Sequence, residues 1–111
     1  MPRADEVRPG KWSEIEVLYD DGEYSLIVGT WMKTDRAFGE RWDGGPGEMG
    51  YPSTHGYPQF HVVPEFRQRS ALHDCLDTLT AHPEAQVGPD TPEERIRRIL
   101  RELGRINRNH H

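Results

Sequence analysis

Residues 15–32 read IEVLYDDGEYSLIVGTWM, two runs of apolar, β-branched and aromatic residues on either side of the sequence DDG. Apolar residues recur at every second position of the first run, at Ile15, Val17 and Tyr19, which is the period of a β-strand. Gly22 suits a tight turn because glycine adopts positive φ without steric cost. The stretch therefore predicts a β-hairpin, and we expect the apolar second strand to be buried on both faces at its centre.

Two further strands are expected beyond this hairpin. A second turn signal at Thr34-Asp35 precedes residues 36–42, whose aromatic residues share one face of a strand. Residues 60–63 (FHVV) are a compact apolar run that Pro64 ends. Because short turns join the first three strands, the sequence predicts an antiparallel meander, to which the fourth strand returns after a long loop. The predicted sheet is four-stranded and mainly antiparallel.

Two helices are expected after the sheet, over residues 65–82 and 91–108. The first carries an apolar stripe about 100° wide on a helical wheel, the width of a core-facing surface. The stripe consists of Leu72, Cys75, Leu76 and Leu79. The second begins with a capping box, in which Thr91 caps the helix and Glu94 reaches back to it.

The element order β-β-β-loop-β-α-α predicts a single α+β domain over residues 11–111, preceded by a polar arm at residues 1–10. The formal net charge of −5 argues against nucleic acid as a partner, because phosphate repels an acidic surface. A single cysteine, Cys75, excludes an intramolecular disulfide and fits a reducing cytoplasm. No apolar run approaches the roughly 20 residues that span a bilayer, so no membrane association is expected. These properties are typical of small, acidic, bacterial-style single-domain proteins, and no motif indicates a particular family.

Residues 42–64 (WDGGPGEMGYPSTHGYPQFHVVP) are the main candidate for a functional site, with five Gly, four Pro, four aromatic residues and two His. Loops of this length are usually functional or disordered, and the aromatic content argues against disorder. Trp42, Tyr51 and Tyr57 belong to residue types enriched at interface hot spots. The segment therefore predicts a recognition surface for a protein or small molecule, while the alternative is an Ω-like loop whose rings fill a small second core.

The histidines support a second interpretation. His55 as a base, with His61 and with Arg41 as an anion clamp, could form a pocket under the loop. Both histidines with Asp43 or Glu48 could hold zinc or iron, but a six-residue spacing is not a ligand signature. The sequence contains no nucleophile elbow, P-loop or His-Glu-x-x-His motif. It therefore predicts no metal, no cofactor and no catalytic residue, and favours binding over catalysis.

The last helix also carries five arginines within an arc of about 100°, opposite its apolar stripe. They are Arg97, Arg98, Arg101, Arg105 and Arg108. This face could be a footprint for an acidic partner. The favoured alternative is a solvated face, or one that docks on the acidic body of the same or a neighbouring subunit.

Taken together, the sequence predicts a small non-enzymatic binding or protein-interaction domain that uses the aromatic Gly/Pro-rich loop as its recognition surface. The predicted contact residues are Trp42, Tyr51, His55, Tyr57, Arg41 and His61. The alternative is a small enzyme or ligand-binding protein with a His55/His61 pocket under that loop. Self-association would stabilise so small a domain by burying a strand edge or an apolar helix flank, so a homo-oligomer is also considered.

Overall fold

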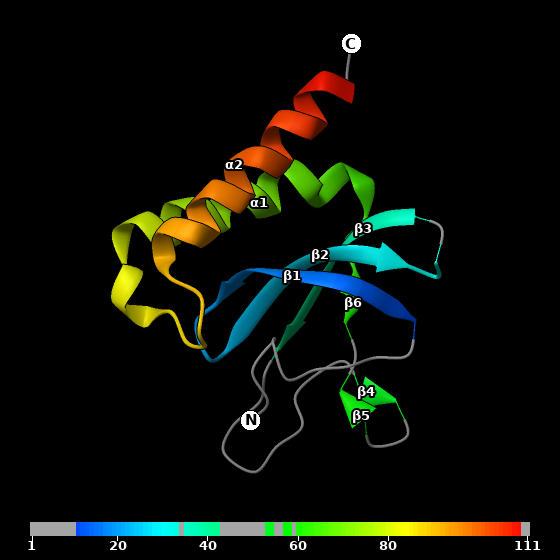
Figure 1. Cartoon of the computed structure of the whole chain (residues 1–111), viewed down its shortest axis with the longest axis horizontal. Coiled ribbons are helices and arrows are strands. Elements are labelled where there is room, and N and C mark those ends of the chain that lie inside the picture. The colour runs from blue at the N-terminus through cyan, green and yellow to red at the C-terminus, as the bar shows by residue number, and fades with distance from the viewer. Residues whose placement is uncertain (1–10, 34, 43–52, 55–56, 59, 110–111) are drawn as a thin grey trace.

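The computed structural model describes residues 11–33, 35–42, 53–54, 57–58 and 60–109 (Figure 1). The predicted polar arm and most of the predicted loop lie outside this described part. The elements are β1 (Trp12–Asp20), β2 (Tyr24–Trp31), β3 (Asp35–Trp42), β4 (Ser53–Thr54), β5 (Tyr57–Pro58), β6 (His61–Val62), α1 (Glu65–Ala81), the 3-10 helix η2 (Pro83–Ala85) and α2 (Pro92–Asn109).

The described strands confirm the predicted α+β fold. One sheet has the order β1-β2-β3-β6 with antiparallel neighbours throughout, and the two α-helices that follow cover one face of it (Figure 1). Strands β4 and β5 form a separate antiparallel pair within the segment predicted to be an irregular loop. None of the helices in the described residues is long and apolar enough to cross a membrane.

The β1–β2 turn has the chemistry that the sequence predicts. Gly22 has φ 89°, and its backbone N–H donates to Oδ1 of Asp20 at 3.0 Å. The next two backbone N–H groups, of Glu23 and Tyr24, donate to Oδ1 of Asp21 at 2.9 Å each. The turn between β2 and β3 begins earlier than predicted, because positive φ falls on Met32 and Lys33 whereas Asp35 already belongs to β3.

Strand β1 departs from the simple alternation expected of it. Its pairing with β2 shifts register twice, once between Ser13 and Glu16 and again between Val17 and Tyr19. Each β-bulge adds a residue to one strand and exchanges the faces of the residues that follow. Val17 therefore packs in a different cluster from Tyr19, and the prediction that they share a face is wrong.

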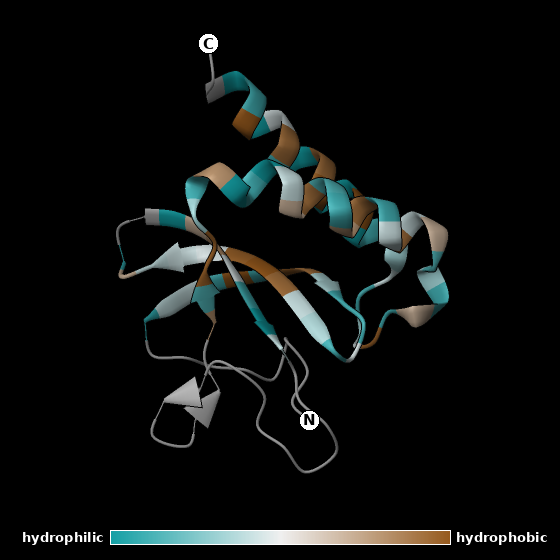
Figure 2. Ribbon diagram, turned by 180° about the vertical axis from the view of Figure 1, so that it is seen from behind, coloured by the Kyte–Doolittle hydropathy of each residue, from teal (hydrophilic) through white to brown (hydrophobic). Residues whose placement is uncertain are grey.

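The main core lies between the sheet and the helices. Leu26 and Val28 of β2 contribute to it, and the predicted stripe of α1 supplies Leu72, Cys75 and Leu79. From α2 it receives Ile99 and Leu103, and Figure 2 shows hydrophobic residues in both helices and at the centre of the sheet. By contrast Leu100 of α2 is 52% exposed, because it lies at the flank of the helix surface that packs on the core.

A second cluster packs on the opposite face of the sheet, so that β2 is buried on both sides as predicted. Trp12 and Phe60 meet edge to face with ring centroids 6.1 Å apart, and Ile27 lies in the same cluster. Gly39 makes this close approach feasible, because a Cβ there would lie 2.9 Å from Cβ of Phe60 and 3.0 Å from Cδ1 of Ile27.

The start of α2 confirms the predicted capping box. The backbone N–H of Glu94 donates to Oγ1 of Thr91 at 3.2 Å, and the N–H of Thr91 donates to Oε2 of Glu94 at 3.1 Å. The segment between η2 and α2 pairs with the last residue of β1, since the N–H of Val87 donates to the carbonyl oxygen of Asp20 at 3.0 Å. This contact protects part of an edge strand from pairing with another chain.

Candidate functional site

The structure describes only part of the predicted recognition surface. Tyr51 and His55 lie outside the described residues, as do Asp43 and Glu48. Tyr57 belongs to β5, where its backbone pairs with Thr54 of β4, and its side chain is not described. The predicted contact residues that are fully described are Arg41, Trp42 and His61.

Trp42 ends β3 and exposes most of its ring. It is 59% exposed, and it lies opposite Tyr24 of β2, with ring centroids 5.1 Å apart. Tyr24 in turn lies 6.2 Å from the ring of Tyr19. One side of the indole is therefore supported by packed aromatic rings, while much of its surface is accessible to a partner.

Glu40 holds the ring beneath Trp42 in place. Its Oε1 accepts a hydrogen bond from Oη of Tyr24 at 2.7 Å, and its Oε2 accepts one from Nη1 of Arg67 at 3.0 Å. Burial, followed by the hydrogen bond to Glu40, raises the pKa of Tyr24 well above its usual range, so the phenol remains neutral. Phe66, beside Arg67 at the start of α1, is 85% exposed. We call Tyr24, Glu40, Trp42 and Arg67 the aromatic corner.

Arg41 and His61 differ in where they lie relative to Trp42. Arg41 is 1% exposed, and it lies on the opposite face from Trp42 because successive residues of a strand point to opposite faces of the sheet. His61 is exposed on β6, where its register partner is Glu40 of β3. The strand geometry thus places Arg41 and Trp42 on opposite faces, and it brings His61 beside the aromatic corner.

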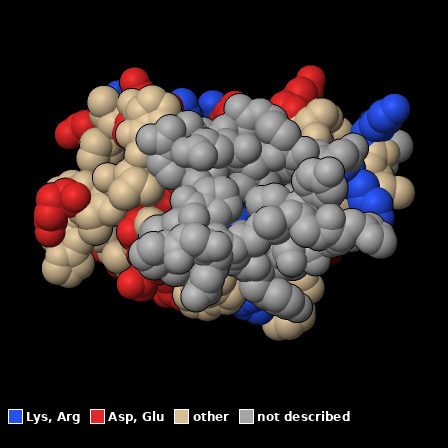
Figure 3. Space-filling model, turned by 90° about the horizontal axis from the view of Figure 1, so that it is seen from below, with Lys and Arg blue, Asp and Glu red and all other residues tan. Residues whose placement is uncertain are grey.

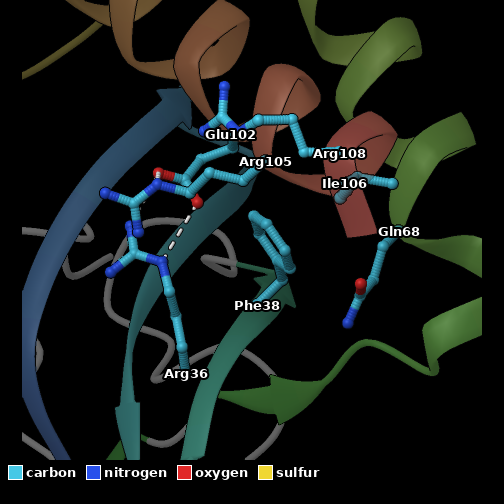
Figure 4. Close-up of a pocket in the computed structure, with 7 residues that line it drawn as sticks. All are labelled: Arg36, Phe38, Gln68, Glu102, Arg105, Ile106 and Arg108. Carbon is cyan, nitrogen blue, oxygen red and sulfur yellow. Dashed lines mark hydrogen bonds and ion pairs between the residues drawn. The ribbon is translucent and has the colours of Figure 1, made fainter. Parts of the chain in front are cut away.

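A hollow of about 250 Å³ lies between β3, α1 and α2, and the sequence alone did not identify it. It is lined by Arg36, Phe38, Gln68, Glu102, Arg105, Ile106 and Arg108, which we call the arginine pocket (Figure 4). Three arginines and one glutamate leave an excess of two positive charges in a chain whose formal net charge is −5. On the face shown in Figure 3, acidic side chains lie mainly at the left, whereas basic side chains lie at the right and along the top and bottom edges.

Glu102 organises the arginine pocket from within. Its side chain is 1% exposed and accepts two hydrogen bonds from Arg36, from Nε at 3.1 Å and from Nη2 at 2.6 Å. The Nε of Arg101 donates to it at 3.2 Å, and the Nε of Arg105 lies 3.9 Å away. One buried carboxylate thus holds guanidinium groups from β3 and α2 that would otherwise repel one another.

The five arginines predicted as one face of α2 have different surroundings in the structure. Nη1 of Arg98 donates to Oδ2 of Asp90 at 3.0 Å and to the carbonyl oxygen of Val17 at 3.1 Å. Arg101 forms an ion pair with Glu16 of β1. These two arginines therefore dock on the acidic body of the same chain, which was the favoured interpretation. The periodicity of α2 did indicate Arg105 and Arg108, but no local signal connects them with Arg36.

The described residues include one thiol, that of Cys75, and side chains of the types that bind metals. Cys75 is 5% exposed within the core, and burial raises the pKa of its thiol to about 12, so it is not a nucleophile at neutral pH. A metal centre would need a group of three or more His, Cys, Asp or Glu side chains, and the described part of the chain contains no such group.

The fold and its surfaces define a small α+β domain with two candidate binding regions, the aromatic corner and the arginine pocket. No family model, curated protein or solved structure matches the chain. The functional interpretation therefore depends on the residues of this chain alone.

Proposed function

We propose that the protein is a small non-enzymatic binding domain that recognises a protein or small ligand through the aromatic corner and the adjoining residues 43–58. The observation that carries the proposal is the exposed ring of Trp42, supported from beneath by Tyr24 at a centroid distance of 5.1 Å. Trp is among the residue types that dominate interface energetics. Because Tyr24 is itself tied to Glu40, little side-chain freedom remains for binding to remove.

The area of the ring is large enough to matter for affinity. Aromatic side chains bury on the order of 150–250 Å² each, and burial contributes about 25 cal/mol per Å². Covering the exposed part of Trp42 would then contribute on the order of 3 kcal/mol. Phe66, which precedes Arg67 in α1, is a further apolar side chain at the surface, 85% exposed.

The proposal is tested by partner capture with matched variants. We expect Trp42→Ala to lose a partner that the wild-type protein retains from its native lysate, and Tyr51→Ala with Tyr57→Ala to act in the same way. Met32→Ala is the control, because Met32 is 50% exposed but lies in the turn at the far end of β3. Gel filtration of the same variants detects a second copy of the chain as the partner.

We expect the Trp42→Ala protein to stay folded, because the substitution removes mainly the aromatic pair with Tyr24. Such a pair contributes about 0.5–1.5 kcal/mol to stability. Thermal unfolding of each variant checks this. Equal capture by wild-type protein and by folded Trp42→Ala would exclude the aromatic corner as the recognition surface. Equal losses in Trp42→Ala and Met32→Ala would show that capture depends on general surface hydrophobicity instead.

A further inference from the structure

We propose that the arginine pocket binds the terminal phosphate group of a phosphomonoester. This site is separate from the aromatic corner and depends on different residues. The charge, the organisation and the size of the pocket support this ligand.

The charge of the pocket matches a dianion. Three arginines and one glutamate line it, which leaves two positive charges in excess. A phosphomonoester carries about −1.5 to −2 at neutral pH, whereas a carboxylate carries only one negative charge. Guanidinium groups also bind phosphate oxygens through paired N–H donors, which favours arginine over lysine at such sites.

The guanidinium groups are organised before any ligand arrives. Arg36 contacts Glu102 through Nε and Nη2, so its contacts with the carboxylate do not use the donors on Nη1. In Figure 4 the side chains of Arg36 and Glu102 meet from β3 and α2, with Phe38 beside them. Glu102 is buried and holds the arginines together, and its negative charge is already included in the excess of two positive charges.

The size and lining of the pocket favour a terminal group over a long polyanion. Its volume of about 250 Å³ lies below the range of about 300–1,000 Å³ typical of pockets for drug-sized ligands. Phe38 and Ile106 provide apolar surface for the carbon atoms next to the ester oxygen, and Gln68 provides an amide. The chain as a whole has a formal net charge of −5, which disfavours an extended nucleic-acid backbone.

The test compares two double variants that remove the same charge. Arg105→Gln with Arg108→Gln removes two residues of the pocket lining, whereas Arg69→Gln with Arg97→Gln removes two exposed arginines elsewhere on α1 and α2. Inorganic phosphate and phenyl phosphate are titrated at constant ionic strength and followed by backbone amide chemical shifts. We expect saturable binding that the lining variant weakens at least about tenfold, equivalent to about 1.4 kcal/mol, and that the control variant changes less than about twofold.

Dimethyl phosphate, a monoanion of similar shape, is expected to bind at least about tenfold more weakly than inorganic phosphate. Two further probes distinguish the source of the group. If a phosphoserine peptide binds more tightly than glycerol phosphate, the phosphate group of the natural ligand belongs to a protein. The reverse order means that it belongs to a metabolite.

Three results would overturn the proposal. One is the absence of saturation below about 10 mM phosphate or phenyl phosphate. Another is an equal loss of affinity in both double variants, which would mean that only net charge matters. The third is equal affinity for dimethyl phosphate and inorganic phosphate. Thermal unfolding of both double variants confirms that each remains folded.

Discussion

Replacing Glu102 with glutamine tests whether one buried carboxylate holds β3 and α2 together at the arginine pocket. The substitution keeps the shape of the side chain and removes its charge. Glu102 accepts hydrogen bonds from Arg36 and Arg101 at distances between 2.6 and 3.2 Å. The ion pairs are lost, and the amide nitrogen of glutamine, which only donates, would face guanidinium donors.

The expected magnitude follows from the burial of the partners. Removing one member of a fully buried ion pair costs about 3–5 kcal/mol. The side chains of Arg36 and Arg101 are 42% and 43% exposed, however, so water screens the charges that remain. We therefore expect the free energy of unfolding to fall by about 2 kcal/mol, which lowers Tm by about 8 °C for a domain of this size.

Urea titration monitored by tryptophan fluorescence, together with calorimetry, measures this loss. Glu23→Gln serves as the control, because it removes the same charge from an exposed position in the β1–β2 turn, and its effect should stay within about 0.5 kcal/mol. If Glu102→Gln unfolds within 0.5 kcal/mol of the wild-type protein, as the control does, the carboxylate does not hold the two elements together.

Four further predictions concern the packing at two glycines, the cap of α2 and the buried thiol of Cys75. Gly39→Ala is expected to lower the free energy of unfolding by about 1–3 kcal/mol, because its Cβ would lie 2.9 Å from Cβ of Phe60. Gly104→Ala is expected to raise it by up to about 1 kcal/mol in the same urea titration, since its nearest neighbour is a side-chain nitrogen at 3.6 Å. Thr91→Ala removes the hydroxyl that accepts from the N–H of Glu94 at 3.2 Å, and should cost about 1 kcal/mol of stability in that assay. Burial raises the pKa of Cys75 from 9.0 to about 12, so between these values the unfolded state has released a proton that the folded state retains. Stability therefore falls as pH rises above about 9, by about 1 kcal/mol at pH 10, and the decline between pH 8 and pH 10 should be shallower in Cys75→Ala.

Each of these predictions has an outcome that contradicts it, and for Gly104→Ala it is a free energy of unfolding equal to or below that of the wild-type protein. Wild-type stability of Gly39→Ala would mean that the layer around Phe60 is loosely packed. An unchanged Thr91→Ala protein would show that the capping box contributes nothing to α2. If wild-type protein and Cys75→Ala lose stability in parallel up to pH 10, another group controls the alkaline transition.

The features that local chemistry specifies could be predicted from the sequence. A tight turn needs a residue tolerant of positive φ, and Gly22 has φ 89°. The capping box needs only residues a few positions apart, and Thr91 and Glu94 form it. A helical stripe follows from the period of the helix, and Leu72 and Leu79 are fully buried on it. In each case the interacting groups are close in the sequence, within a turn or a few turns of a helix.

The features that depend on packing between distant segments could not be predicted in this way. The bulges of β1 reverse the faces expected for Val17 and Tyr19, because register is fixed by the whole sheet and not by one strand. The burial of Arg41 beside the exposed Trp42 likewise depends on what covers each face.

The linear chain was therefore sufficient for the kinds of element, their order, and the α+β class, since these depend on periodicity and on short-range hydrogen bonds. The arginine pocket required the folded chain. Arg36 and Glu102 are 66 positions apart, and they meet because α2 packs across the sheet. A charge can be read from a sequence, but the carboxylate or guanidinium that faces it depends on how separate segments are brought together.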